Sequence, residues 1–142
     1  MTAFDLEQTY LFIDGAGGVV PAPVTPDFWR TMGSIPNAGD TLITVSGGNG
    51  GAWPRWEMHP AGDEILVILE GAPTIWFEHA DGRLQRTDAR AGATVVVPKG
   101  AWHRAESARA YKILFITYGA GTTHKPVTDA DRARAEALSE AR

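Results

Sequence analysis

The chain has 142 residues, of which 44% are hydrophobic and 21% are charged, a balance that suits one globular domain with a packed core. Its 17 acidic residues against 13 basic ones give a formal net charge of −4, which excludes the broad basic surface that nucleic-acid binding requires. There is no cysteine, so disulfides, thiolate nucleophiles and Cys-type zinc sites are excluded. Any metal must therefore sit on His, Asp or Glu.

The sequence shows neither a secretory signal nor a membrane span. Residues Met1–Tyr10 carry two acids and lack both a basic region and an apolar run. The longest aliphatic run, Ile65–Leu69, is too short to cross a bilayer. We therefore expect a cytoplasmic protein with no membrane partner and no nucleic-acid partner.

The N-terminal 40 residues predict an arm with one strand and one short helix. Thr9–Asp14 is rich in β-formers and is followed by glycines and prolines that favour a turn and an extended segment. Thr25 as N-cap, with a proline and an acid after it, predicts a helix over Pro26–Met32. Phe28 and Trp29 on this helix are interpreted either as simple core residues or as a lid on the rest of the domain.

The middle of the chain predicts many short strands separated by turn residues. Gly47–Gly51 is expected to be a loop, and Asp81-Gly82 is a strong hairpin signal. Because helical signals occur only near the two ends, we expect an all-β antiparallel sandwich or barrel. The expected strands are 41–46, 52–58, 64–70, 74–78, 84–88, 94–97 and 111–118.

The tail over residues 128–142 is different in composition. It is rich in Ala, Arg and Glu, and Thr128 followed by Asp131 is typical of a helix N-terminus. We expect a short solvated helix with no assigned function.

Polar side chains with metal-ligating chemistry cluster in two places. Because side chains alternate along a strand, Glu57 and His59 share a face with Trp53 and Arg55. Glu64 begins the next strand, and a tight return between the two strands brings its carboxylate toward His59. These donors predict a polar site on one face of the sheet.

Far along the chain, a buried strand and a Pro-Gly turn lead to His103. Two sets of residues follow a recognisable spacing: Gly51, Glu57, His59, Glu64 and Gly71, and then Gly92, Pro98, Gly100 and His103. They resemble the first and second motifs of the cupin family. Glu57 stands where the first motif normally has the first His of His-x-His, and Ser107 stands where the second motif ends in Asn.

The resemblance implies a double-stranded β-helix, also called a jelly-roll barrel, with short helical segments at both ends. It implies one cupin domain over residues 1–142, with a motif core at about 51–107, an N-terminal arm over 1–40 and a tail over 120–142. It also implies one divalent metal ion per chain, held at the positions of Glu57, His59, Glu64 and His103.

The identity of the ion and the role of Glu57 stay open at this point. Two imidazoles and one carboxylate already form the ligand set of non-haem iron sites. As a fourth ligand, Glu57 makes the site harder and favours Fe, Mn or Zn, with Ni as a further option. As a non-ligand, Glu57 is placed to act as a catalytic general base. The third alternative is that the loss of the first His has emptied the site.

Two residues are candidates for a substrate pocket. Trp53 is interpreted either as a pocket wall or as packing between sheets. Arg55 suits an anionic substrate if it faces inward, and otherwise pairs with a structural acid or lies at the rim. His79 is expected to be an exposed histidine without a role. His124 follows the last expected strand and is interpreted either as an exposed histidine without a role or as a residue over the barrel mouth.

Strands that are apolar on both faces predict a second subunit. Glu64–Glu70 and Tyr111–Tyr118 both carry aliphatic residues on each face, and such strands need cover on both sides. With few helices available, we expect a homodimer through the outer sheet, which also buries Trp56 and Met58.

Three functions agree with these observations. The first is a metal-dependent enzyme acting on a small organic molecule as an oxygenase, an isomerase or a hydrolase. The second is a non-catalytic module that binds a metal or a metabolite. The third is a metal-free sugar-nucleotide epimerase in which His59 serves as the base.

Overall fold

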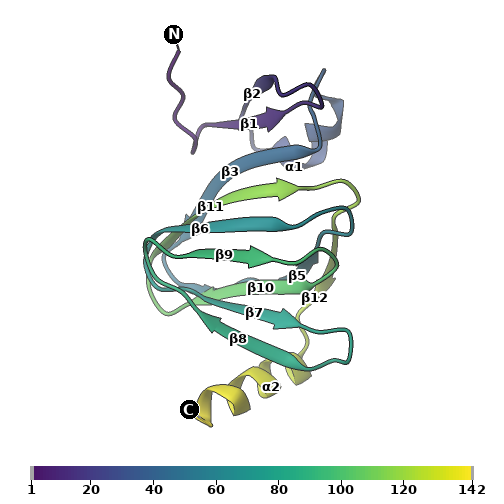
Figure 1. Ribbon diagram of the computed structural model, residues 1–142. Helices are drawn as coiled ribbons and strands as arrows, with labels where there is room; N and C mark the ends of the chain where they lie inside the picture. The colour runs from purple at the N-terminus through teal and green to yellow at the C-terminus, as the bar shows by residue number, and fades with distance from the viewer. Residues whose placement is uncertain (1, 142) are drawn as a thin grey trace.

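The computed structural model describes residues 2–141 and shows two antiparallel sheets that form a jelly-roll barrel, as expected from the sequence (Figure 1). One sheet has the strand order β2-β1-β3-β11-β6-β9 and the other β12-β5-β10-β7-β8, with β4 paired to β10. The strands are β1 Thr9–Ile13, β2 Val19–Pro23, β3 Thr41–Gly48, β4 Gly51–Ala52, β5 Arg55–Met58, β6 Glu64–Glu70, β7 Thr74–Glu78, β8 Leu84–Asp88, β9 Thr94–Val97, β10 Trp102–Ser107, β11 Tyr111–Tyr118 and β12 Thr123–Pro126.

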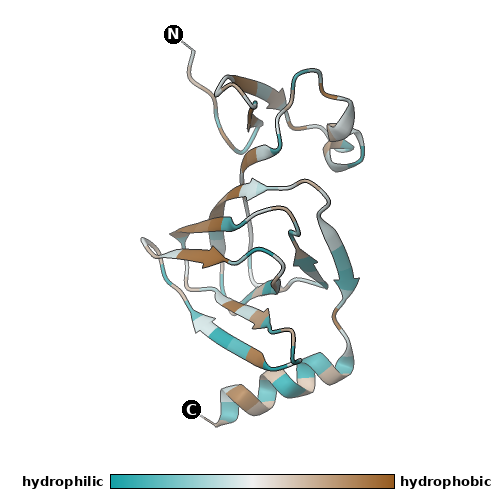
Figure 2. Cartoon of the chain, turned by 45° about the vertical axis from the view of Figure 1, so that its right-hand side comes forward, coloured by the Kyte–Doolittle hydropathy of each residue, from teal (hydrophilic) through white to brown (hydrophobic). Residues whose placement is uncertain are grey.

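The core between the two sheets consists of residues from alternate strand positions. Leu66 and Ile68 of β6 face Ile75 of β7 and Ala105 of β10, and each is at most 1% exposed. Figure 2 shows hydrophobic segments along the barrel strands, whereas the C-terminal helix is hydrophilic along much of its length. The alternating apolar residues that predicted these strands are thus the residues whose side chains fill the barrel.

The N-terminal arm adds a second apolar cluster at one end of the barrel (Figure 1). The helix α1 covers Phe28–Thr31 and continues as a 3₁₀ turn, η1, over Met32–Ser34. It begins two residues later than expected, because the Thr25 hydroxyl donates to the Asp27 carboxylate instead of capping the helix. The two aromatic residues of α1 diverge: Phe28 is buried in this cluster, and Trp29 is 62% exposed.

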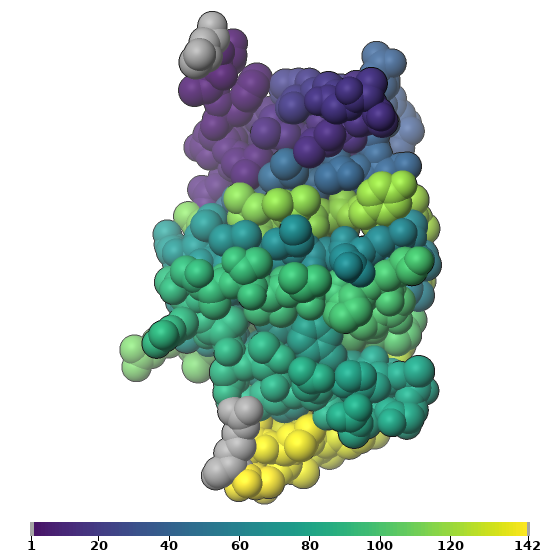
Figure 3. All heavy atoms as spheres, in the orientation of Figure 1, coloured from purple at the N-terminus to yellow at the C-terminus, as the bar shows by residue number. Residues whose placement is uncertain are grey.

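The C-terminal helix α2, Asp129–Glu140, packs at the opposite end of the molecule (Figure 3). Its capping box between Thr128 and Asp131 confirms the expected helix start. Asp131 also accepts a hydrogen bond from Trp56 Nε1 at 3.1 Å, and Trp56 is fully buried in a cluster with Ala135. The expectation that a second subunit buries Trp56 is therefore wrong, since a helix of the same chain covers it.

Among the helices within residues 2–141, none is long and apolar enough to cross a membrane.

Strand boundaries differ from the expectation around the first glycine loop. Strand β3 continues to Gly48, and β4 begins at Gly51, so the loop is shorter than expected. The expected strand 52–58 is broken between β4 and β5, where Pro54 lacks the N–H that a continuous ladder requires. Strands β10 and β12 were not predicted.

Candidate metal centre

Four predicted ligand residues come together between the two sheets. Glu57 lies on β5 directly opposite His103 on β10, and the two are paired in register. His59 follows the end of β5, and Glu64 is the first residue of β6 in the other sheet. The site therefore bridges both sheets of the barrel.

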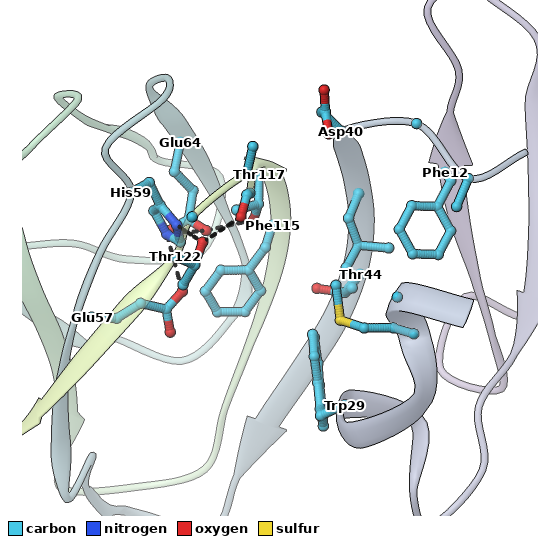
Figure 4. A pocket seen from close by; sticks show the side chains of 18 of the residues that line it. Phe12, Trp29, Asp40, Thr44, Glu57, His59, Glu64, Phe115, Thr117 and Thr122 are labelled. Atoms are coloured by element: carbon cyan, nitrogen blue, oxygen red, sulfur yellow. Dashed lines mark hydrogen bonds and ion pairs between the residues drawn. The ribbon is translucent and has the colours of Figure 1, made fainter. Parts of the chain in front are cut away.

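The side-chain atoms of these residues converge on one point. His59 Nε2 lies 3.0 Å from Glu57 Oε1 and 3.2 Å from Glu64 Oε2, and His103 Nε2 lies 3.1 Å from Glu64 Oε1. One potential ligand atom from each of the four residues lies within 4.8 Å of the other three. Figure 4 shows Glu57, His59 and Glu64 pointing toward one another. This spacing suits four ligands around a single cation.

The geometry of these contacts favours a cation over hydrogen bonding within the cluster. His59 Nε2, Glu64 Oε1 and His103 Nε2 are buried and form no hydrogen bond of normal geometry, although oppositely charged or polar atoms lie close by. Buried polar atoms without partners are costly. A metal ion at the common centre satisfies all three, so the residues present fit a divalent cation.

Neighbouring groups hold the ligands in orientation. Thr122 Oγ1 lies 2.7 Å from His59 Nδ1, and Thr117 Oγ1 donates to Glu64 Oε2 at 2.5 Å. The Nδ1 atom of His103 lies 3.4 Å from the carbonyl oxygen of Ala101. Both histidines thus have Nδ1 toward the barrel wall and Nε2 toward the cluster, the arrangement that metal-bound histidines usually adopt.

The cluster is electrostatically suited to positive charge. Burial acts to lower the pKa of His59, but Glu57 and Glu64 outweigh it and raise that pKa to about 9. Burial likewise acts to raise the pKa of Glu64, but His103 and His59 lower it to about 2. Burial acts to raise the pKa of Glu57 as well, but the nearby imidazoles of His59 and His103 together lower it. Both carboxylates are therefore ionised at neutral pH and stabilise a cation between them.

The cluster opens into a cavity of about 880 Å³. Trp53 lines this cavity and also packs on Phe115, with ring centroids 5.9 Å apart, so it has both of the roles considered for it. Arg55 does not line the cavity: it is exposed at the start of β5, where it is paired only with Pro126 of the edge strand β12. Of the alternatives considered for Arg55, the structure therefore excludes the one in which it faces the pocket.

The site includes a histidine for which the sequence favoured an exposed position without a role. His124 lines the cavity, and its Nε2 lies 3.2 Å from Glu57 Oε2. It comes from β12, an edge strand that the sequence did not predict, so nothing indicated that it pairs with β5. Glu57 thus has one carboxylate oxygen toward His59 in the cluster and the other toward His124.

Comparison with known proteins agrees with this fold. The profile of the family described as "Cupin domain" matches residues 41–117, which is more than half of the chain. The chain belongs to the cupin family. A search of curated proteins returned no match.

Solved cupin structures share the fold at low sequence identity. An oxalate oxidase in complex with glycolate is 22% identical, with a TM-score of 0.51 over 59% of this chain and 45% of that one. The oxalate decarboxylase of Bacillus subtilis, a protein with Mn(II) centres, is 18% identical, with a TM-score of 0.52 over 61% of this chain and 24% of that one. A cupin-2 domain protein from Shewanella frigidimarina is 27% identical over 55% of this chain and 70% of that one, with a TM-score of 0.46.

This cupin spans less than half the length of the oxalate oxidase and about a quarter of the oxalate decarboxylase. Its Glu and His cluster lies within the family segment, at Glu57, His59, Glu64 and His103. By contrast, Thr122 and His124, which support the cluster, lie beyond that segment.

Proposed function

We propose that this cupin is a metal-dependent enzyme that acts on a small organic molecule at a mononuclear centre held by Glu57, His59, Glu64 and His103. The observation that carries the proposal is the convergence of these four buried or half-buried residues, three of which, Glu57, His59 and Glu64, line a cavity. Perturbed titratable groups in a cavity are typical of a reactive site. Oxygenation, isomerisation and hydrolysis all remain within this proposal, since one fold hosts many reactions.

A divalent ion bound here supplies Lewis acidity and, for Fe or Mn, redox chemistry. The chain's own residues fix the geometry: Thr122 and Thr117 orient His59 and Glu64. Glu57 is the most exposed of the four residues, with 26% of its side chain accessible to solvent. Its second oxygen, near His124, is placed to accept a proton from a molecule in the cavity.

The metal-free epimerase is the weaker alternative. A sugar nucleotide carries a diphosphate, which proteins usually bind with Arg or Lys. Within the described chain, residues 2–141, neither residue type lines the cavity. In addition, His59 Nε2 faces two carboxylates, so it is not free to act as a base on substrate.

Elemental analysis of protein purified without added metal tests the proposal. We expect Fe, Mn or Zn at close to one ion per chain in the wild type and its loss in His103→Ala. Val96→Ala, a substitution of an exposed residue on β9 that is not part of the cluster, is the matched control and should retain the ion. Wild-type protein that takes up no divalent ion, even when Fe²⁺, Mn²⁺ and Zn²⁺ are supplied, would overturn the proposal. Metal binding without turnover of any oxidisable or hydrolysable probe would instead favour the non-catalytic module.

A further inference from the structure

The cavity has two chemically different ends. The metal ligands occupy one end, and an apolar wall built by the N-terminal arm occupies the other. Figure 4 shows Trp29 and Phe12 across the cavity from Glu57, His59 and Glu64. The apolar wall consists of Phe12, Trp29, Met32, Ile35 and Ala38.

This wall is not part of the segment that defines the family. The cupin profile begins at residue 41, and every residue of the wall precedes it. The N-terminal arm is held in place by its own cluster, in which Tyr10 packs edge-on against Phe28 with ring centroids 5.0 Å apart. The family segment thus provides the metal ligands, and the arm provides a preformed surface that faces them.

Trp29 is the most exposed aromatic side chain of the wall. Its indole is 62% exposed although it lines the cavity. A large exposed aromatic beside a cavity is typical of a binding surface. A bound apolar group would cover Trp29, and Phe115 and Trp53 extend the same apolar lining toward the metal ligands.

The charges around the cavity disfavour anions. Its lining includes the acids Asp40, Glu57 and Glu64, and no Lys or Arg side chain contributes to it within the described chain, residues 2–141. A divalent cation is already balanced by Glu57 and Glu64, which leaves the charge of Asp40 uncompensated at the rim. An anion entering this cavity gives up its hydration without gaining a protein cation, which is costly.

We propose that the cavity takes an uncharged small molecule with an oxygen-bearing end and an apolar body. The oxygen end faces the metal ligands, and the apolar body packs on Trp29 and Met32. This inference names the substrate class of the proposed metal centre and rests on that proposed function. A small dianion such as oxalate, the substrate in the names of two structural neighbours, is the wrong class for this chain.

A matched pair of probes tests the charge preference. Calorimetric titration of the metal-loaded protein compares 2-hydroxyacetophenone, which is uncharged, with benzoate, which has the same ring and a carboxylate. We expect the uncharged probe to bind more tightly by about tenfold or more, the size of a single unfavourable charge interaction. Benzoate or oxalate binding as tightly as the uncharged probe would overturn the proposal.

Substitution of Trp29 tests the apolar wall. Trp29→Ala should weaken the binding of 2-hydroxyacetophenone by roughly three- to tenfold, the contribution of one aromatic contact. Trp29→Phe should retain most of the wild-type affinity, and Val96→Ala should leave the affinity unchanged. Because Trp29 is exposed, its removal should not unfold the chain, and unchanged metal content serves as the check. Equal affinity in Trp29→Ala and wild type would overturn the proposal.

The two proposals fail separately. If the protein takes up no divalent ion, the proposed function is wrong, and the same titrations on the metal-free protein still decide the substrate class. The apolar wall and the acidic lining are present without an ion, so the uncharged probe should again be preferred. If metal binds and benzoate is preferred, the metal centre stands and the substrate class is wrong.

Discussion

Thr122 determines which nitrogen of His59 faces the cluster. The Thr122 hydroxyl donates its single proton to the carbonyl of Gly119 at 2.9 Å, so it can only accept from His59 Nδ1, 2.7 Å away. With a metal ion bound, the neutral imidazole would carry its proton on Nδ1 and present the Nε2 lone pair to the ion beside Glu57 and Glu64. Thr122, which lies beyond the cupin segment, thereby orients His59, which lies within it.

Thr122→Val should weaken metal binding while leaving the fold intact. Valine has nearly the shape of threonine but accepts no hydrogen bond, so the ring of His59 loses its fixed orientation. Loss of such a supporting partner typically costs about 10- to 100-fold in metal affinity. Calorimetric titration with Mn²⁺ measures the change, and Thr122→Ser, which retains the hydroxyl, should bind like the wild type. Unchanged affinity in Thr122→Val would show that Thr122 does not orient the ligand.

Substitutions of Glu57 should separate a ligand from a general base. Glu57→His restores the family's usual residue at this position and should retain the ion, because an imidazole is also a good ligand for Fe, Mn and Zn. Catalysis should fall if the carboxylate acts as the base. Metal content and turnover measured on Glu57→His and Glu57→Ala distinguish the roles. A Glu57→Ala variant with full metal content and full turnover would exclude both.

Asp131 should stabilise the protein in a pH-dependent manner. Burial acts to raise its pKa, but hydrogen bonds from the Thr128 backbone, Arg134 and Trp56 outweigh it, and the pKa lies well below the usual 3.8. A lowered carboxyl pKa in the folded state means that its stabilisation is present above pH 3.8 and is lost as the pH falls further. Asp131→Asn should therefore cost about 1–3 kcal/mol at pH 7 and less at pH 3.

Urea unfolding at the two pH values measures this difference. Asp129→Asn is the matched control, since Asp129 lies in the same helical turn but is fully exposed. We expect it to change stability by less than about 0.5 kcal/mol. An equal loss for Asp131→Asn at pH 3 and pH 7 would contradict the assigned role of the charge.

The homodimer stays a prediction. The outer face of β6 and β9 exposes Leu69 by 42% and Val96 by 56%, and within residues 2–141 neither α1 nor α2 covers it (Figure 1). Sedimentation equilibrium at micromolar concentration should show a dimer, and Val96→Lys should shift it toward monomer. Val19→Lys, at an equally exposed position on β2, is the control. A wild-type monomer would remove the prediction.

Strands with aliphatic alternation were predictable from the sequence, and polar strands were not. The bounds of β6 and β11 agree with the expectation because their buried residues alternate along an apolar pattern. Strand β10 has the sequence WHRAES, and its buried residues include His103, Arg104 and Ala105, which carry no aliphatic signal. Strand β12 is short, polar and at the edge of its sheet. Pairing with partners remote along the chain determines both strands.

The four residues of the cluster were predictable through the two motifs, but the rest of the cavity was not. Residue spacing places Glu57, His59, Glu64 and His103 in a recognised pattern. Trp29 and His124 reach the cavity only because the arm and β12 fold back over the barrel. Arg55 illustrates the converse: alternation predicted that it shares the face of Glu57, but its place at the start of an interrupted strand leaves it in solvent.

X-ray diffraction from crystals grown with Mn²⁺, recorded with anomalous scattering from the metal, tests the central claim most directly. We predict one strong anomalous peak per chain between Glu57, His59, Glu64 and His103, with ligand distances of about 2.0–2.3 Å. A cluster without an anomalous peak, with His59 Nε2 in direct contact with the two carboxylates, would contradict the assignment of a metal centre.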